Sequence, residues 1–190
     1  MEFGVNKLRS AVKVLVVDDL PSIVDELCEF LDSSGYPCIP CVSSRRALEC
    51  FEEDSEIGLV LCDLSMPQMN GIELVQAMHK VAGRHRAFES IMLTGRADKQ
   101  DVIKALRAGF SDYYQKPIDL DELLEGVQRQ EAAVQERQKE LHLKHLNQKL
   151  QHLSETINDL YHDLDKVRRN PGTGAADDDV LLSEETAAID

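Results

Sequence analysis

The chain has 190 residues, a formal net charge of −14, and charged residues at 29% of its positions. This length suits one well-packed domain with an appendage, but is short for two domains with separate cores. The acidic balance argues against direct binding of nucleic acid or of an anionic membrane surface, because negative charges repel phosphate groups.

The first predicted unit is a strand that leads into a helix. Residues 12–17 are a short, continuous, β-branched apolar run, which is typical of a strand covered on both faces. Asp18 and Asp19 end this run. Pro21 follows at a position where the first turn of a helix tolerates proline, and Gly35 marks the end of that helix.

The second predicted strand differs from the first. Residues 36–42 look extended but contain Pro37 and Pro40, which cannot donate a hydrogen bond to a neighbouring strand. This composition indicates an edge strand, and a helix is predicted after it, over about residues 44–53.

The rest of the pattern predicts strands at residues 57–62, 90–93 and 112–115, with helices at 72–81, at 98–108 and from about 119 onward. Strands that alternate with helices favour right-handed crossovers and a parallel sheet covered on both faces. We therefore expect a flavodoxin-like, doubly wound α/β fold with strand order 2-1-3-4-5, in which the reactive site lies beyond the carboxyl ends of the strands.

Polar residues stand at those strand ends: Asp18 and Asp19 after the first strand, Asp63 after the third, Thr94 after the fourth and Lys116 after the fifth. Each alone has a commoner structural explanation, such as a helix cap or a turn. Together they predict one crevice in which carboxylates are compensated by a divalent cation and an ammonium group.

These motifs resemble the receiver domain of bacterial response regulators over roughly residues 10–130. The matching features are the pair Asp18 and Asp19, Asp63 in LCDLSMPQMNG, Thr94 in MLTG, and Lys116 before a proline. The resemblance implies that Asp63 accepts a phosphoryl group from a sensor histidine kinase, a phosphotransfer protein or a small phosphodonor. It also implies self-catalysed dephosphorylation, without a separate enzyme domain in this chain.

The resemblance also implies a metal site. Asp19 and Asp63 would bind Mg²⁺ directly, Asp18 would act through a bound water, and the backbone carbonyl of Ser65 would complete the protein's share. Mg²⁺ suits such a partial oxygen shell, and Mn²⁺ is the alternative. Lys116 would pair with a phosphate oxygen.

A switch is implied as well. The hydroxyl of Thr94 would move toward the new phosphate, and Tyr113 would swing inward behind it. Tyr113 is preferred to Tyr114 because alternate residues of a strand face opposite sides. The family also implies a cis bond between Lys116 and Pro117.

The last helix has no proline up to residue 169 and is predicted to continue beyond the receiver as a coiled coil. Apolar residues recur there at spacings of three and four, which is the a and d pattern of four heptads: Leu143, Leu146, Leu150, Leu153, Ile157, Leu160, Leu164 and Val167. Opposite charges at Asp163 and Arg168 favour a parallel homodimer. A helical hairpin, or a helix packed back on its own receiver, is the alternative.

The predicted organisation is an N-terminal extension at residues 1–10, a receiver at 11–130, a coiled-coil helix at 131–169 and an acidic, flexible tail or linker at 170–190. We expect a cytoplasmic protein, since neither a secretory signal nor an apolar run of about 20 residues is present. The five cysteines are then expected to be reduced thiols.

Two hypotheses remain for how phosphorylation is converted into a cellular response. In the first, phosphorylation changes dimerisation or the docking of a downstream effector protein. In the second, the chain is the regulatory N-terminal portion of a larger effector enzyme of the phosphatase or diguanylate cyclase type, whose output domain would follow.

Overall fold

Strand β1 (Lys13–Val17) is buried on both faces, as its β-branched composition predicts. Val14 and Val16 pack on one side of the sheet, and Leu15 and Val17 pack on the other. This computed structural model describes residues 12–95 and 99–169. The expectations for residues 1–10 and 170–190 therefore lie outside the described residues.

Within the described residues, five strands alternate with five helices, and all strand pairs are parallel. The sheet order is β2-β1-β3-β4-β5, which confirms the predicted flavodoxin-like fold and places β2 at an edge. The remaining elements are α1 (Pro21–Ser33), β2 (Cys38–Cys41), α2 (Ser44–Glu53), β3 (Ile57–Asp63), α3 (Gly71–Ala82), β4 (Glu89–Thr94), α4 (Lys99–Ala108), β5 (Asp112–Gln115) and α5 (Leu120–Arg169).

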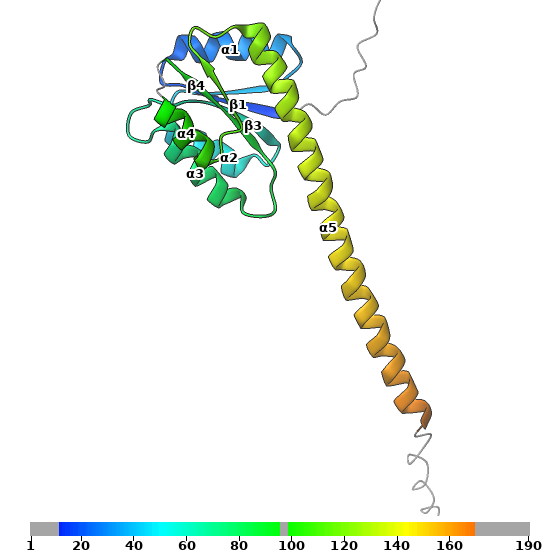
Figure 1. The fold of residues 1–190 in the computed structure, drawn as a ribbon. Helices are drawn as coiled ribbons and strands as arrows, with labels where there is room; N and C mark the ends of the chain where they lie inside the picture. Colours follow the sequence, from blue (N-terminus) through cyan, green and yellow to red (C-terminus); the bar gives the residue numbers. More distant parts are fainter. Residues whose placement is uncertain (1–11, 96–98, 170–190) are drawn as a thin grey trace, which may run out of the picture. The chain divides into compact units, whose positions relative to one another are not determined.

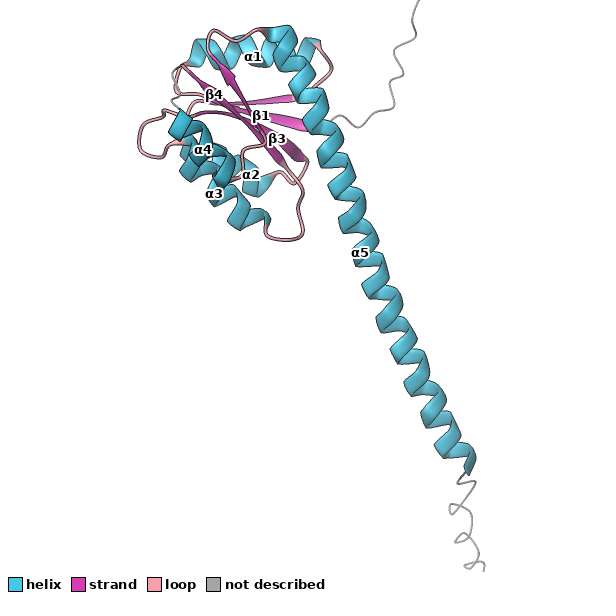
Figure 2. Cartoon of the chain, in the orientation of Figure 1, coloured by secondary structure: helices cyan, strands magenta, loops and turns pink. Residues whose placement is uncertain are grey.

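Helices cover both faces of the sheet (Figures 1 and 2). One core lies under α2, α3 and α4 and contains Phe51 and Leu74. The other lies under α1 and the first part of α5 and contains Leu31 and Leu123. Because both faces of the central strands are buried in these two cores, the polar groups at the carboxyl ends of the strands are held on a rigid frame.

The long last helix is confirmed: α5 runs without a break for 50 residues. Its first part belongs to a compact unit that extends to Leu143, and Val127 and Val134 are fully buried there. From Lys144 the helix belongs to a second unit, in which every described residue is exposed. No helix in the described part of the chain is both long and apolar enough to cross a bilayer.

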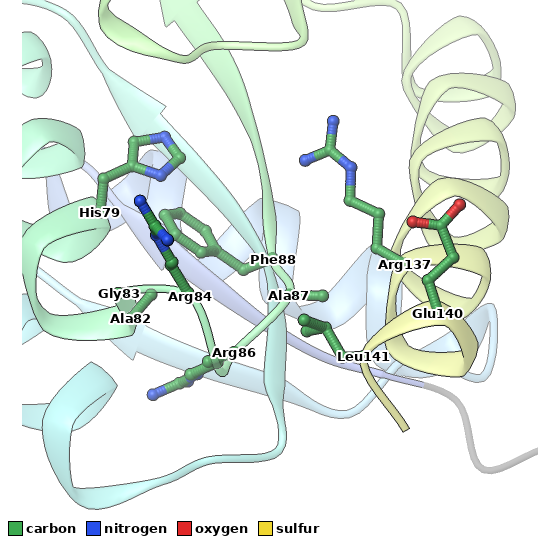
Figure 3. Close-up of a pocket in the computed structure, with 10 residues that line it drawn as sticks. All are labelled: His79, Ala82, Gly83, Arg84, Arg86, Ala87, Phe88, Arg137, Glu140 and Leu141. Atoms are coloured by element: carbon green, nitrogen blue, oxygen red, sulfur yellow. The ribbon is translucent and has the colours of Figure 1, made fainter. Parts of the chain in front are cut away.

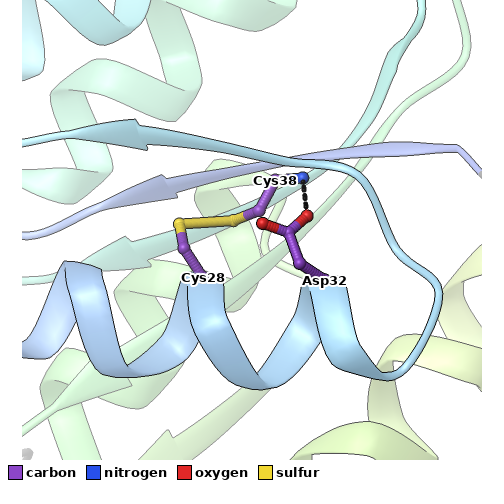
Figure 4. The surroundings of a disulfide bond; sticks show 3 residues. All are labelled: Cys28, Asp32 and Cys38. Atoms are coloured by element: carbon purple, nitrogen blue, oxygen red, sulfur yellow. Dashed lines mark hydrogen bonds between the residues drawn. A yellow bond between two sulfur atoms is a disulfide. The ribbon is translucent and has the colours of Figure 1, made fainter.

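A disulfide joins Cys28 of α1 to Cys38 of β2 (Figure 4). The backbone N–H of Cys38 also donates to the Asp32 carboxylate, at 2.9 Å. The expectation that all five cysteines are reduced is therefore wrong for this pair. Sequence spacing could not reveal the pairing, because it depends on how β2 lies against α1.

Candidate functional site

Four of the predicted polar residues come together at the carboxyl edge of the sheet. Asp18 directly follows β1, Asp63 and Thr94 are the last residues of β3 and β4, and Lys116 directly follows β5. Because neighbouring parallel strands end at the same edge, residues far apart in the sequence meet there.

Lys116 links the two buried carboxylates of this cluster. Its Nζ atom lies 2.5 Å from Asp18 Oδ2 and 2.5 Å from Asp63 Oδ1. Asp18 is 0% exposed and Asp63 is 5% exposed. Burial opposes the charge on Lys116, but its hydrogen bonds to Asp18 and Asp63 outweigh that effect and raise its pKa above the ordinary lysine value.

The second oxygen of each carboxylate is held by the backbone. The N–H of Leu20 donates to Asp18 Oδ1 at 3.0 Å, and the N–H of Ser65 donates to Asp63 Oδ2 at 2.6 Å. Both carboxylates are thus oriented before any ligand arrives. Asp19, in contrast, is exposed beside them.

The charge of the cluster is not balanced. Two buried carboxylates share one ammonium, which leaves one negative charge, and the exposed Asp19 adds a second. Within residues 12–95 and 99–169, no three His, Cys, Asp or Glu side chains are arranged as a metal cage. A cation that needs only one or two protein carboxylates and otherwise keeps water still fits this arrangement.

Thr94 and Tyr113 flank the cluster differently. Thr94 is buried, and its carbonyl accepts a hydrogen bond from the N–H of Lys116 at 2.8 Å. Tyr113 is 48% exposed, whereas Tyr114 is buried against α5, so the two rings face opposite sides of the sheet as predicted. The bond between Lys116 and Pro117 is cis, as the resemblance implied.

The connection from β3 to α3 contains residues that the sequence analysis did not single out. Asn70 caps α3 and forms a capping box with Glu73. A side chain at Gly71 would overlap the backbone carbonyl of Asp63, so only glycine fits there. The Asn-x-x-Glu spacing before an apolar run could have predicted the cap, whereas the close approach at Gly71 is a tertiary feature.

A pocket of about 270 Å³ lies away from this cluster, between the α3–β4 connection and α5 (Figure 3). Its lining includes His79, Arg84, Phe88 and Arg137, and none of the predicted site residues. We therefore assign the candidate site to the polar cluster and not to the pocket.

Comparisons with known proteins agree with this geometry. The sequence model of the response regulator receiver domain matches residues 14–128. The two-component response regulator PprB of Pseudomonas aeruginosa is 46% identical over 156 residues, which cover 82% of this chain and 57% of that protein. The regulatory protein VanR of Enterococcus faecium is 34% identical over 118 residues, which cover 62% of this chain and 49% of that protein.

The chain thus spans about half the length of these two curated relatives. Among solved structures, a CheY-like receiver domain protein of Methanospirillum hungatei superimposes with a TM-score of 0.61 at 30% identity, covering 69% of this chain and 99% of that one. The family match spans more than half of the chain and includes all the strand-end residues described above. The chain belongs to the response regulator receiver family of two-component signalling.

Proposed function

We propose that Asp63 is the phosphoryl acceptor of this receiver. The observation that carries the proposal is the position of Lys116 Nζ, 2.5 Å from the carboxylates of both Asp63 and Asp18. An ammonium fixed beside the acceptor can neutralise charge on the incoming phosphoryl oxygens, and phosphoryl transfer is catalysed mainly by positioning and charge neutralisation. The phosphodonor would be a sensor histidine kinase, a phosphotransfer protein or a small phosphorylated molecule.

Mg²⁺ fits the uncompensated charge of the cluster. Asp63 and the exposed Asp19 would ligate it directly, Asp18 through a water, and the backbone carbonyl of Ser65 would add a further oxygen; Mn²⁺ is the alternative ion. The bound ion would draw charge from the phosphoryl oxygens and bring donor and acceptor together. Asp18 would keep Lys116 in place, because the same ammonium contacts both carboxylates.

The chain would respond to the phosphoryl group through Thr94 and Tyr113. The Thr94 side chain is at the end of β4, next to β3, which ends in Asp63, and the exposed Tyr113 ring has room to move. If the Thr94 hydroxyl moved toward the phosphate, it would leave free space beside β4 and β5. The inward position of Tyr113 would then mark the phosphorylated state.

We expect the phosphorylation signal to be transmitted by dimerisation of two copies of the chain through α5. The eight apolar residues of the a and d stripe, from Leu143 to Val167, are 44–70% exposed in the single chain. A narrow stripe of this kind is stable in water when a second helix covers it, and a parallel coiled coil is the arrangement that its spacing fits. No contact in the described residues favours the alternative role as the head of a phosphatase or diguanylate cyclase.

Acetyl phosphate with Mg²⁺ tests the acceptor. The intact mass of the full chain should rise by one phosphoryl group, and the gain should disappear in Asp63→Asn. Asp121→Asn, in the exposed first turn of α5, is the matched control and should be phosphorylated like the wild type. Equal phosphorylation of Asp63→Asn and the wild type would exclude Asp63 as the acceptor.

A further inference from the structure

The edge strand β2 carries two cysteines that point to opposite faces of the sheet. Cys38 packs into the core on the α1 side and Cys41 into the core on the α2 side. Each has a cysteine from the neighbouring helix beside it. Cys38 is bonded to Cys28 of α1, while the Sγ atom of Cys41 lies 3.8 Å from that of Cys50 of α2.

Cys41 and Cys50 have the different environments that stepwise oxidation requires. Of the three cysteines outside the disulfide in the described residues, Cys41 and Cys62 are buried and Cys50 is partly exposed. Burial raises the pKa of Cys41 to about 12, so this residue stays a thiol, and its S–H is directed at the Cys50 sulfur. Because Cys50 is the more exposed residue of the two, we assign the first oxidation step to its sulfur.

We propose that Cys41 and Cys50 are an oxidisable thiol pair, which a peroxide converts into a second disulfide that fastens α2 to β2. This oxidation does not depend on the acceptor role of Asp63. The pair differs from Cys28 and Cys38 in being reduced in the present structure.

The chemistry balances in two steps. The Cys50 thiolate attacks one peroxide oxygen, so that an S–O bond forms, the O–O bond breaks and the leaving hydroxide takes a proton to become water. The Cys41 sulfur then attacks the Cys50 sulfenic acid; the S–S bond forms, the S–O bond breaks, and the hydroxide leaves as a second water with the Cys41 proton. The two thiols lose two electrons and the peroxide is reduced.

The second step brings the two sulfurs from 3.8 Å to about 2.0 Å apart. We expect this approach to combine side-chain rotation with a shift of α2 toward β2. The shift would reach the loop after Asp63. Ser44, the first residue of α2, donates its hydroxyl proton to the Met69 carbonyl of that loop, at 2.7 Å.

Disulfide mapping of the full chain tests the proposal. The protein is treated with hydrogen peroxide, its remaining thiols are blocked with N-ethylmaleimide, and it is digested without reductant by trypsin and a glutamate-specific protease. Neither protease cleaves between Cys38 and Cys41, so we expect three linked peptides, in which residues 30–45 are joined through Cys38 to Cys28 and through Cys41 to Cys50. The link from Cys41 to Cys50 lowers the mass by two hydrogen atoms, and dithiothreitol should release all three peptides. Cys50→Ser should abolish the link, while Cys62→Ser, the matched control, should leave it unchanged.

Two results would overturn the proposal. One is a Cys41 that N-ethylmaleimide still labels after oxidation and unfolding, with Cys50 converted to a sulfinic acid. The other is a disulfide between Cys50 and a cysteine other than Cys41. Hydrogen exchange tests the fastening itself: the amides of α2 should exchange more slowly in the oxidised wild type, and an unchanged rate in protein with the mapped bond would refute that part.

Discussion

Arg137 of α5 forms an ion pair with Glu89, the first residue of β4, with 2.7 Å between Nη1 and Oε1. The Glu89 carboxylate is buried, and its other oxygen accepts a hydrogen bond from the Ser111 hydroxyl. β4 ends at Thr94, beside the acceptor cluster. The carboxyl end of β4 therefore lies at the proposed phosphorylation site. Its amino end is joined by the ion pair to α5, the helix that leads into the predicted coiled coil.

Removing the Arg137 guanidinium should weaken this connection. In Arg137→Ala the buried Glu89 carboxylate loses its charged partner, and the free energy of unfolding should fall by about 1–3 kcal/mol. Urea denaturation monitored by circular dichroism measures the change. Lys139→Ala removes an exposed cation from the same helix and should cost less than about 0.5 kcal/mol. Equal losses in the two variants would show that the ion pair does not hold α5.

The shared ammonium of Lys116 leads to a prediction about stability. In Asp63→Asn, Lys116 keeps Asp18 as its partner while the repulsion between the two carboxylates is lost. Without divalent cations, this variant should be more stable than the wild type, by about 1 kcal/mol. Thermal unfolding in EDTA measures the difference. A variant that is clearly less stable than the wild type would contradict the proposed charge imbalance.

Mg²⁺ should make the wild type more stable than Asp63→Asn, because the ion binds only to the folded wild-type protein. The melting temperature of the wild type should rise with Mg²⁺ concentration, and that of Asp63→Asn should stay nearly constant. A titration in the same thermal assay, with K⁺ added at matched ionic strength as the control, separates binding from screening. Equal shifts in both proteins would exclude Asp63 as a ligand.

Much of the fold and the site could be predicted because each depends on local pattern plus topology. The alternation of apolar strands and helices fixed the sheet order, and this order brought Asp18, Asp63 and Lys116 to one edge. Pro40 lies within β2, and the edge position of this strand agrees with the prediction, because a proline has no N–H to donate to a further strand.

Features that depend on close approach between distant segments could not be predicted. In the sequence, Val127 and Val134 are seven residues apart, but they lie at a different heptad position from the stripe that starts at Leu143. In the structure both valines are buried against the sheet, whereas Leu143 is exposed. The change of phase therefore marks the point where α5 stops contacting its own receiver. The Cys28–Cys38 disulfide could not be predicted either, because no local sequence pattern encodes it.

Gly71 gives a prediction at the acceptor loop. A methyl group there would overlap the carbonyl oxygen of Asp63, which is backbone and cannot rotate away. Gly71→Ala should therefore shift the loop, lower the free energy of unfolding by about 1–3 kcal/mol and slow phosphorylation by acetyl phosphate. Gly95→Ala, where the added methyl would meet open space at the same edge of the sheet, is the control. A phosphorylation rate in Gly71→Ala equal to that of Gly95→Ala would contradict this reading.

The ion pair between Lys13 and Asp54 gives a pH dependence. Its Nζ to Oδ2 distance is 2.8 Å; the hydrogen bond from Lys13, followed by the one from the Glu56 N–H, lowers the pKa of Asp54. A carboxylate with a lowered pKa in the folded state stabilises the protein above its unfolded pKa of about 3.9, and this contribution is lost as the pH falls through the folded value. At alkaline pH the pair should persist, because the hydrogen bonds of Lys13 to the side chains of Asp54 and Glu56 raise the pKa of Lys13 to about 12.

Comparison with Asp54→Asn isolates this contribution. The wild type should melt at a slightly higher temperature between pH 5 and 8, with a constant difference, because both states carry the charged carboxylate there. The difference should shrink as the pH falls below about 3.9. Thermal scans across this range measure it, and a difference that grows toward low pH would contradict the assigned sign.

Replacing two residues of the apolar stripe of α5 with aspartate should dissociate the proposed dimer. With Leu143 counted as an a position, Leu150 and Ile157 are the next two a positions, and both are exposed in the single chain. Burying each at a helix interface contributes about 2 kcal/mol, and a carboxylate there would also have to lose its water. The double variant Leu150→Asp and Ile157→Asp should therefore be a monomer by light scattering. Gln148→Asp with His162→Asp adds the same charges at two f positions of the heptad and should leave the mass of the wild-type dimer unchanged. A wild-type mass in the first double variant would show that the stripe does not pair two copies.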